Sequence, residues 1–341
     1  MKCINTTDAV GHVLCHDITR IVKDVVKDAA FRKGHVVTEE DIPLLLSLGK
    51  DHLYVWEKDE NTLHEDEAAQ ILYQVCRNEH MHPTPVKEGK IELVADCDGL
   101  FRVDVDRLDA INELDEIMIA TRHSNTAVKK GDRLLGTRVI PLVIQKEKME
   151  QVKKAAGDTP LVSLTPFLSM KAGIVTTGNE VYHGRIKDTF TPVIIDKLAS
   201  YGINVCGHEI CDDDQEKITN AIMKLKQDGA DMILCTGGMS VDPDDRTPGA
   251  IKATGARIVT YGAPVLPGAM LLLAYFEDGT PVLGLPGCVM YAKATAFDLI
   301  LPRIAAGVEL TKKDLAHMGN GGFCLGCNTC HYPACGFGKG I

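Results

Sequence analysis

Carboxylate and glycine residues follow several apolar segments that predict buried strands. Glycine pairs let backbone N–H groups approach an anion closely, as phosphate-binding loops do. Aspartate and glutamate oxygens, with phosphate oxygens and water, are the ligands that Mg²⁺ prefers. The pattern therefore predicts a site for a phosphate-bearing ligand and a divalent metal ion. The residues that would build it are, in strand order, Thr177, Gly178 and Glu180; Asp212, Asp213 and Asp214; Gly237, Gly238 and Ser240 with Asp242, Asp244 and Asp245; and Gly284, Pro286 and Gly287.

Each part of this pattern has an ordinary structural alternative. A Gly-Gly pair is often only a tight turn, and acidic triplets are usually solvated surface. The triplet 212–214 lies directly before a helical pattern, so one of its residues is expected to cap that helix. The run 284–287 also precedes a predicted helix, whose N-terminus would offer a second anion site. The occurrence of all these runs at successive strand ends favours a binding site over unrelated turns.

Four of the twelve cysteines lie close together near the end of the sequence, at Cys324, Cys327, Cys330 and Cys335. Four thiolates with the spacing C-x2-C-x2-C-x4-C can surround a tetrahedral Zn²⁺ or an iron–sulfur cluster, with His331 as an alternative ligand. The alternative is a reduced, unstructured tail that binds no metal, because glycines flank the run on both sides. We expect a metal-binding tail with a structural or docking role, and the spacing leaves Zn²⁺ and an Fe–S cluster both open.

The elements that must position the first site alternate between strands and helices. Strands are expected at 173–176, 203–210, 232–235, 257–261, 270–275 and 282–285, and helices at 193–201, 215–227 and 291–304. Such alternation predicts parallel pairing and an α/β fold with a layered, mostly parallel sheet. In such sheets, ligands bind at the carboxyl ends of the strands.

The sequence before this sheet mixes strand-like and helix-like patterns and predicts a smaller α+β region. A helix start is expected at Thr38 with Asp41 three residues on, a helix over 108–119, and a linker over 146–160. The expected organisation is an N-terminal region at 1–165, divided into one or two subdomains, an α/β domain at 170–306, and the cysteine-rich tail at 320–341.

The composition bounds the classes of partner. The 341 residues include 37 Lys and Arg against 47 Asp and Glu, which gives a formal net charge of −10, and 45% are hydrophobic. This composition excludes a disordered chain and argues against nucleic acid or an anionic membrane as the main partner. No apolar run approaches the ~20 residues that span a bilayer, and the first residues lack the apolar core of a signal peptide. We expect a cytoplasmic protein.

The run from 173 to 306 resembles the molybdopterin-binding domain that MoeA, MogA and gephyrin share. Five motifs appear in the family's order: Thr177–Glu180 matches T-G-[DN]-E, Asp212-Asp213 matches D-D, Thr236–Val241 matches [ST]-G-G-x-S-V, Asp245 matches the aspartate that closes that loop, and Gly284–Gly287 matches G-L-P-G. The segment from Phe31 to Val55 resembles the region that precedes this domain in MoeA-type proteins. Single-domain MogA-type proteins lack that region, so the resemblance favours the MoeA type.

The resemblance implies a reaction and its partners. MoeA-type proteins take adenylylated molybdopterin, insert molybdenum from molybdate at the dithiolene and release AMP, with Mg²⁺, and they are commonly homodimers. Glu180, Asp212 and Asp245 match family positions linked to metal and substrate handling. The positions that match the cofactor-binding motifs are Thr177, Gly178, Gly237, Gly238, Ser240, Gly284, Pro286 and Gly287.

Three departures from the family pattern keep other functions open. The family's P-G-K-P loop carries a lysine, but residues 266–270 read Leu-Pro-Gly-Ala-Met. The family's G-L-P-G-N-P continues here with Cys288 and Val289, and few residues follow Ile304 for the family's C-terminal β-barrel. A non-catalytic molybdopterin carrier, chaperone or sensor for a molybdoenzyme is the second hypothesis. A MogA-like adenylyltransferase is the third, and tungsten in place of molybdenum also stays open.

Overall fold

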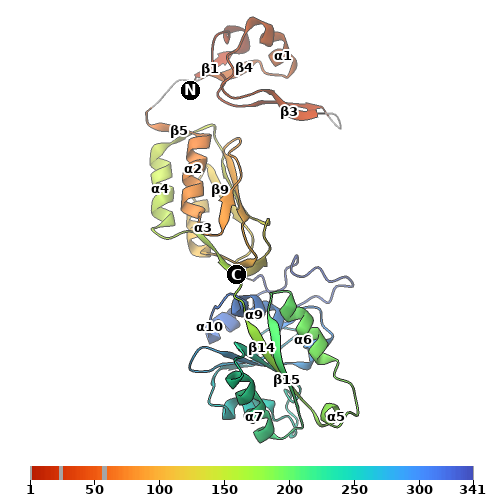
Figure 1. Ribbon diagram of the computed structural model, residues 1–341. Helices are drawn as coiled ribbons and strands as arrows, with labels where there is room; N and C mark the ends of the chain where they lie inside the picture. Colours follow the sequence, from red (N-terminus) through yellow and green to blue (C-terminus); the bar gives the residue numbers. More distant parts are fainter. Residues whose placement is uncertain (1, 23–25, 56–59, 341) are drawn as a thin grey trace. The chain divides into compact units, whose positions relative to one another are not determined.

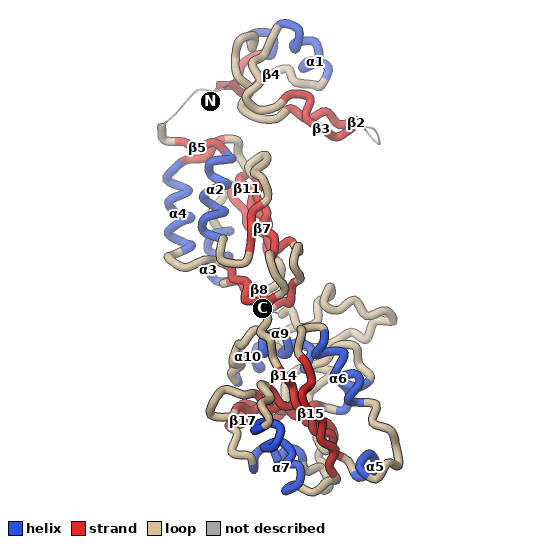
Figure 2. Tube along the Cα trace, viewed as in Figure 1, coloured by secondary structure: helices blue, strands red, loops and turns tan. Residues whose placement is uncertain are grey.

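The computed structural model describes residues 2–22, 26–55 and 60–340 (Figures 1 and 2). The chain forms two compact units. The first comprises residues 1–97, 102–122 and 129–164, and the second comprises residues 98–101, 123–128 and 165–341.

The start of the first unit is a small set of hairpins and short helices around its own core. Leu14, Ile18, Phe31, Leu45 and Leu53 are buried there together. The Thr38 start is as expected, because the Asp41 carboxylate accepts from both the backbone N–H and the hydroxyl of Thr38 at 2.8 Å. The elements are β1 (Lys2–Asn5) paired antiparallel with β4 (His52–Val55), β2 (Ile18–Val22) paired antiparallel with β3 (Val26–Phe31), η1 (Thr6–Asp8), η2 (Glu39–Asp41) and α1 (Ile42–Ser47).

The rest of the first unit has a four-stranded antiparallel sheet, ordered β6-β7-β11-β9, with helices packed on it. The strands are β6 (Met81–Pro83), β7 (Lys90–Ala95), β11 (Arg133–Val139) and β9 (Ile117–Thr121), and the helices are α2 (Glu65–Cys76), α3 (Val105–Asn112) and α4 (Lys146–Ala156). Short strands β5 (Thr62–His64) and β12 (Val143–Gln145) pair antiparallel. Three further strands, β8 (Gly99–Val103), β10 (Thr126–Val128) and β13 (Val162–Pro166), form a small sheet ordered β10-β8-β13; β10 and most of β8 belong to the second unit.

Two expectations for this part of the sequence are wrong. The expected linker over 146–160 is mostly helix α4, because Met149, Val152 and Ala156 form an apolar stripe that is buried on one face. The expected helix over 108–119 ends at Asn112. The Asn112 side chain bonds both the N–H and the carbonyl of Ile119, at 2.8 and 2.9 Å, and ties the helix end to strand β9.

The second unit is built on a six-stranded, mostly parallel sheet ordered β15-β14-β16-β19-β18-β17, which confirms the α/β fold class. The strands are β14 (Lys171–Thr177), β15 (Asn204–Cys211), β16 (Met232–Thr236), β17 (Arg257–Tyr261), β18 (Leu272–Tyr275) and β19 (Pro281–Leu285). The β15-β14, β14-β16 and β16-β19 pairs are parallel, and the β19-β18 and β18-β17 pairs are antiparallel. Strand alternation sends side chains to two different cores on the two faces.

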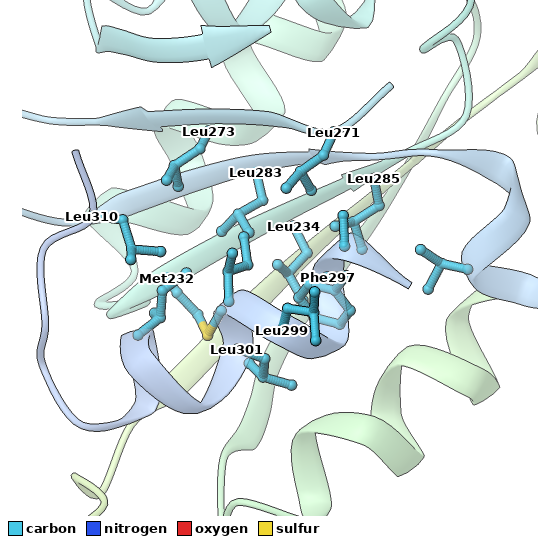
Figure 3. Close-up of a cluster of buried hydrophobic side chains, with 14 of the residues drawn as sticks. Met232, Leu234, Leu271, Leu273, Leu283, Leu285, Phe297, Leu299, Leu301 and Leu310 are labelled. Carbon is cyan, nitrogen blue, oxygen red and sulfur yellow. The ribbon is translucent and has the colours of Figure 1, made fainter. Parts of the chain in front are cut away.

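The first of these cores packs α6 (Phe190–Ala199) and α9 (Ala296–Ala305) on the sheet through Ile174, Leu234, Leu283, Phe297 and their neighbours (Figure 3). The opposite face packs α7 (Gln215–Gln227) and α8 (Thr247–Ala253). Glycines in the strands permit this contact, because a Cβ on Gly173 or Gly207 would lie 2.9 or 2.5 Å from the Leu225 side chain.

The helix expected over 291–304 begins later than the sequence pattern indicates. A single turn, η3 (Gly287–Met290), follows β19, and α9 starts only at Ala296. Thr295 caps α9, because its hydroxyl accepts from the Phe297 N–H at 3.2 Å while the Asp298 carboxylate accepts from the Thr295 N–H at 2.8 Å. The short helices α5 (Asn179–Tyr182) and α10 (Lys312–His317) complete the unit.

Candidate functional site

The candidate site lies at the carboxyl edge of the parallel strands, where the strand order reverses. Strand β14 is central, and the chain passes first to β15 on one side and then to β16 on the other. Such a reversal leaves a crevice at the strand ends where α/β proteins bind ligands. The loops after these strands contact one another there, because Gly178 N–H donates to the Cys211 carbonyl at 3.2 Å and the Thr177 hydroxyl donates to the Thr236 carbonyl at 3.2 Å.

The glycine pair after β16 is required by its packing against the neighbouring strand end. Gly237 has a φ of +83°, and a Cβ there would lie 2.2 Å from the Thr177 carbonyl oxygen. Gly238 has a φ of +55°, and a Cβ there would lie 2.8 Å from the Thr247 hydroxyl. The buried Thr247 hydroxyl donates to the Gly237 carbonyl at 2.9 Å and holds the loop in place. The two loops therefore form one rigid backbone surface at the crevice.

Asp213 is within electrostatic range of carboxylates from two other loops at this edge of the sheet. Burial raises the pKa of Asp213, and the negative charges of Glu180, Asp244 and Asp245 raise it further. Asp213 also accepts from the backbone N–H of Asn179, at 3.0 Å, and so ties the loop after β15 to the turn after β14. Glu180 and Asp245, two of the expected site residues, thus act on Asp213 through their charge, and their roles in binding or catalysis stay predictions.

The other two members of the aspartate triplet have separate partners. Asp212 pairs with Lys217 at 2.6 Å, and this hydrogen bond lowers the pKa of Asp212. Asp214 is the N-cap of α7 and accepts from the Lys217 N–H at 3.0 Å, as expected for one residue of the triplet. Lys217 was not among the candidate residues. The sequence could have indicated this pairing, because Lys217 lies in the first turn of a predicted helix that directly follows an acidic run.

The loop after β19 does not present the helix N-terminus that the sequence predicts. Gly287 begins one short 3₁₀ turn, and α9 starts only after Thr295, so the expected long helix directly after Gly287 is wrong, while anion binding by this loop stays a prediction. Gly284 is a packing residue, because a Cβ there would lie 2.4 Å from the Met239 sulfur. Cys288 is partly exposed, and burial raises the pKa of its thiol. Pro286 and Gly287 remain at the strand end beside the other loops.

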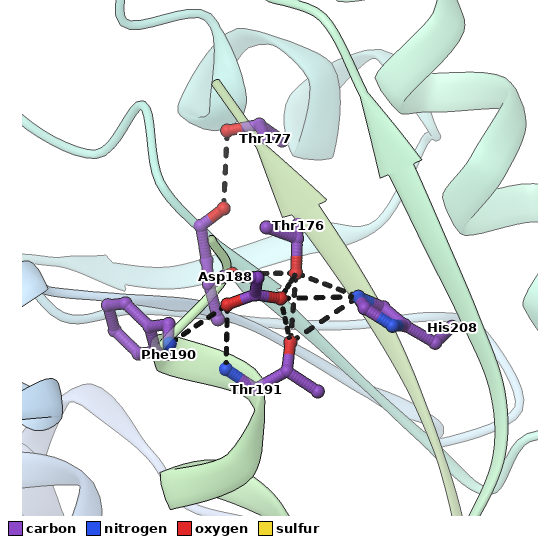
Figure 4. A network of polar contacts seen from close by, with 7 residues as sticks. Thr176, Thr177, Asp188, Phe190, Thr191 and His208 are labelled. Atoms are coloured by element: carbon purple, nitrogen blue, oxygen red, sulfur yellow. Dashed lines mark hydrogen bonds and ion pairs between the residues drawn. The ribbon is translucent and has the colours of Figure 1, made fainter. Parts of the chain in front are cut away.

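A polar network next to β14, formed by two buried threonines, the half-buried Asp188 and the exposed His208, is the feature that the sequence analysis missed (Figure 4). The Asp188 carboxylate accepts from the Thr191 hydroxyl at 2.6 Å and from the N–H groups of Phe190 and Thr191 at 2.8 and 3.0 Å. The Thr176 hydroxyl lies 2.9 Å from Nε2 of His208 and 3.1 Å from the Thr191 hydroxyl. The network fixes the start of α6 to the last residues of β14. An aspartate two residues before an apolar helical run was the available signal.

Asp188 is expected to stabilise the second unit at neutral pH and not in acid. Burial would raise its pKa, but the hydrogen bonds from Thr191, Phe190 and Thr176 outweigh burial and lower it. A lowered pKa gives stability that is present above the ordinary pKa of about 4 and is lost as the pH falls through the folded value. Asp188→Asn should reduce the free energy of unfolding by about 1–2 kcal/mol at pH 7, and by less at pH 3, in urea unfolding. Asp196→Asn is the control, because Asp196 is an exposed carboxylate on α6, and this variant should change the free energy of unfolding little. Equal effects of the two variants would contradict the role of the network.

Neither expected metal site is preassembled among the residues that the structure describes. Within residues 2–22, 26–55 and 60–340, no three His, Cys, Asp or Glu side chains lie close enough together to hold one metal ion. This applies to Glu180, Asp212 and Asp245 and to the four cysteines of the tail. Cys327 and Cys330 are exposed, while Cys324 and Cys335 are half-buried, and all four are free of disulfides.

No helix in the described part of the chain is long and apolar enough to span a membrane.

Two stretches of the chain match known families. Residues 173–306 match the probable molybdopterin binding domain, and residues 3–57 match a domain of unknown function. A putative competence-damage inducible protein of Bacillus mycoides is 38% identical over 97 residues, which are 28% of this chain and 23% of that protein. A molybdopterin molybdenumtransferase of Synechococcus elongatus is 25% identical over 225 residues, which are 60% of this chain and 54% of that protein. The chain thus spans between about a quarter and about half of the length of these relatives.

Solved structures with similarity to part of the chain include the molybdopterin biosynthesis enzyme MoaB of Thermus thermophilus, at 22% identity and a TM-score of 0.34, over 40% of this chain and 97% of that one. A molybdenum cofactor biosynthesis protein of Pyrococcus furiosus is similar at 14% identity and a TM-score of 0.27, over 91% of this chain and 66% of that one.

Proposed function

Since residues 173–306 match the probable molybdopterin binding domain, we propose that the chain inserts molybdenum from molybdate into adenylylated molybdopterin and releases AMP. The observation that carries the proposal is the carboxylate group around Asp213 at the reversal point of the sheet, beside the rigid turn of Gly237 and Gly238. The similarity to a molybdopterin molybdenumtransferase over 60% of the chain supports it.

The donor set at this edge fits Mg²⁺. This ion keeps several waters and is usually bound by one or two carboxylates together with phosphate oxygens of the substrate. A preassembled group of three protein ligands is therefore not needed. We propose Asp213 and Asp245 as the carboxylates that would hold the ion, since the negative charges of Glu180, Asp244 and Asp245 act on Asp213 and a cation would offset them. When bound, Mg²⁺ would polarise the pyrophosphate of the adenylylated substrate.

The protein's own residues would orient the substrate within this arrangement. The Thr177–Gly178 turn and the Gly237–Gly238 turn are fixed to each other, so the backbone groups at the crevice are held before the ligand arrives. We propose that Glu180 orients the attacking oxygen at the phosphorus. Glu180 folds back over its own turn, with its carboxylate oxygens 3.2 Å from the Cβ position of Gly178.

A carrier or chaperone for a molybdoenzyme is the second candidate, and one observation favours it. The loop at 266–270 lacks the lysine that the MoeA pattern has. A tail segment is bound to this loop by hydrogen bonds at 2.8 Å from the Leu266 N–H to the Gly322 carbonyl and from the Cys324 N–H to the Leu266 carbonyl. A carrier would bind molybdopterin tightly and release no AMP. An adenylyltransferase would instead require ATP.

The reaction is tested by following AMP release from adenylylated molybdopterin with Mg²⁺ and molybdate, with protein purified without oxygen. We expect molybdate-dependent release that Glu180→Gln and Asp245→Asn each reduce by about 100-fold. Asp278→Asn is the matched control, because Asp278 is an exposed carboxylate that pairs with Lys226 just before β19, at the opposite end of that strand. Tight binding of molybdopterin without AMP release would contradict the insertase and support the carrier.

A further inference from the structure

The cysteine tail surrounds a cavity of its own within the second unit. The cavity has a volume of about 460 Å³, and all four tail cysteines line it: Cys324, Cys327, Cys330 and Cys335. His331 and Lys293 line the same cavity. The four cysteines, which are spread over twelve positions of irregular chain, therefore line one cavity. Their spacing in the sequence alone does not require this arrangement.

The tail is fastened to the folded domain on both sides of the cysteines. Gly338 N–H donates to the Gly321 carbonyl at 2.9 Å and closes the segment between them into a loop. The Tyr332 hydroxyl donates to the Asp298 carbonyl at 3.0 Å, and Phe337 is buried in the core that α9 forms with the sheet. The loop is thus a built structure and not the unstructured tail that the flanking glycines allowed.

We propose that the four cysteines bind one thiophilic metal centre in this cavity. Zinc and iron–sulfur centres both take four thiolates, and both then carry a net charge of −2. Binding would release the thiol protons, because the thiolate is the ligand. Lys293 is among the residues that line the cavity, and a lysine ammonium group near the centre would offset part of this negative charge.

The thiols surround the cavity without converging on a point, so binding has to draw the loop inward. Pro267 lies at the same cavity wall, and the neighbouring Leu266 is hydrogen-bonded to the tail backbone. Occupation of the site would therefore stiffen the loop at 263–271 together with the tail. This effect is separate from the proposed insertion reaction and can be read without molybdopterin.

The test compares two double variants of the full chain. Cys327→Ser/Cys330→Ser removes two exposed tail thiols, and Cys3→Ser/Cys206→Ser removes two exposed thiols elsewhere, so neither double variant deletes a buried side chain. Protein purified without oxygen is exposed to Zn²⁺ alone, or to an equimolar mixture of Fe²⁺ and Fe³⁺ with sulfide, and is then desalted. Bound metal, acid-labile sulfide and visible absorption are then measured. We expect the control variant to retain as much metal as the unaltered chain. The tail variant should retain about a tenth of that amount or less.

Two readouts keep the result interpretable. About one zinc per chain identifies a zinc centre, whereas iron with equal sulfide and visible charge-transfer absorption identifies a cluster; either outcome supports the proposal. Hydrogen exchange should slow in residues 321–338 and 263–271 on loading, in the unaltered chain and the control only. Equal metal retention by both double variants, or no retention by the unaltered chain, would overturn the proposal.

Discussion

Gly237→Ala should destabilise the second unit by about 3 kcal/mol or more. Two effects add. The left-handed backbone at Gly237, with a φ of +83°, costs an L-residue about 1 kcal/mol. The new methyl group would also lie 2.2 Å from the Thr177 carbonyl oxygen, so a backbone atom of the crevice has to move. Urea unfolding measures the loss, and molybdopterin binding should fall with it because the Thr177–Gly178 turn is displaced.

Gly229→Ala separates these two effects. Gly229 has nearly the same backbone conformation, with a φ of +89°, but no atom lies within 4 Å of its Cβ position. It lies between α7 and β16, away from the carboxyl edge of the sheet. The Gly229 variant should therefore lose only about 1 kcal/mol and should keep its binding. Equal losses in the two variants would show that the close approach of the loops after β14 and β16 has no energetic weight.

Asp213→Asn should reduce molybdate-dependent AMP release by about 100-fold. The negative charges of Glu180, Asp244 and Asp245 act on Asp213. A cation bound at Asp213 would therefore be stabilised by all of these charges. Asp212→Asn should have a much smaller effect, because Asp212 is paired with the exposed Lys217 and surface pairs contribute about 0–1 kcal/mol. The two variants differ by one position in the chain and make the same chemical change. A larger loss for Asp212→Asn would contradict the assignment.

The pH profile gives this prediction a second measurement. Because burial and the neighbouring carboxylates raise the pKa of Asp213, its carboxyl group ionises at a higher pH than an ordinary aspartate in the metal-free protein. AMP release should thus rise with pH on an acid limb that lies higher than the ordinary pKa of about 4. Asp244→Asn removes one of the charges that raise this pKa, and the limb should move to lower pH. An unmoved limb would mean that another group controls it.

Periodicity in the sequence predicts the sheet of the second unit well, because its strands are short apolar runs and its helices amphipathic. Helix α7 has the bounds that its apolar stripe predicts. Helix α9 begins later than expected because Thr295 and Asp298 form a capping box inside the apolar run. The segment 146–160 was interpreted as a linker because its lysines and glutamates outnumber the three apolar residues that α4 buries.

The candidate site was harder to predict than the fold, for reasons of geometry. Adjacent aspartates look equivalent in sequence, but one faces the carboxylate cluster, one pairs with Lys217 and one caps a helix. The network of Thr176, Asp188, Thr191 and His208 joins three elements that are distant in sequence, so only the fold brings it together. A glycine pair in a sequence does not reveal whether a ligand or a neighbouring strand end requires it. In this protein, Thr177 and Thr247 are what require it.

The segment after α9 changes what counts as the domain. Leu310, Leu315, Met318 and Phe337 are buried in the same core as Ile174 and Leu234, although they lie beyond residue 306, where the match to the molybdopterin-binding family ends. The segment that matches the family is therefore shorter than the segment that shares one hydrophobic core. A gene fragment cut at the edge of the similarity would encode the ligand loops but would leave one face of their scaffold open to water. In this chain, residues of the tail complete the hydrophobic core of the second unit.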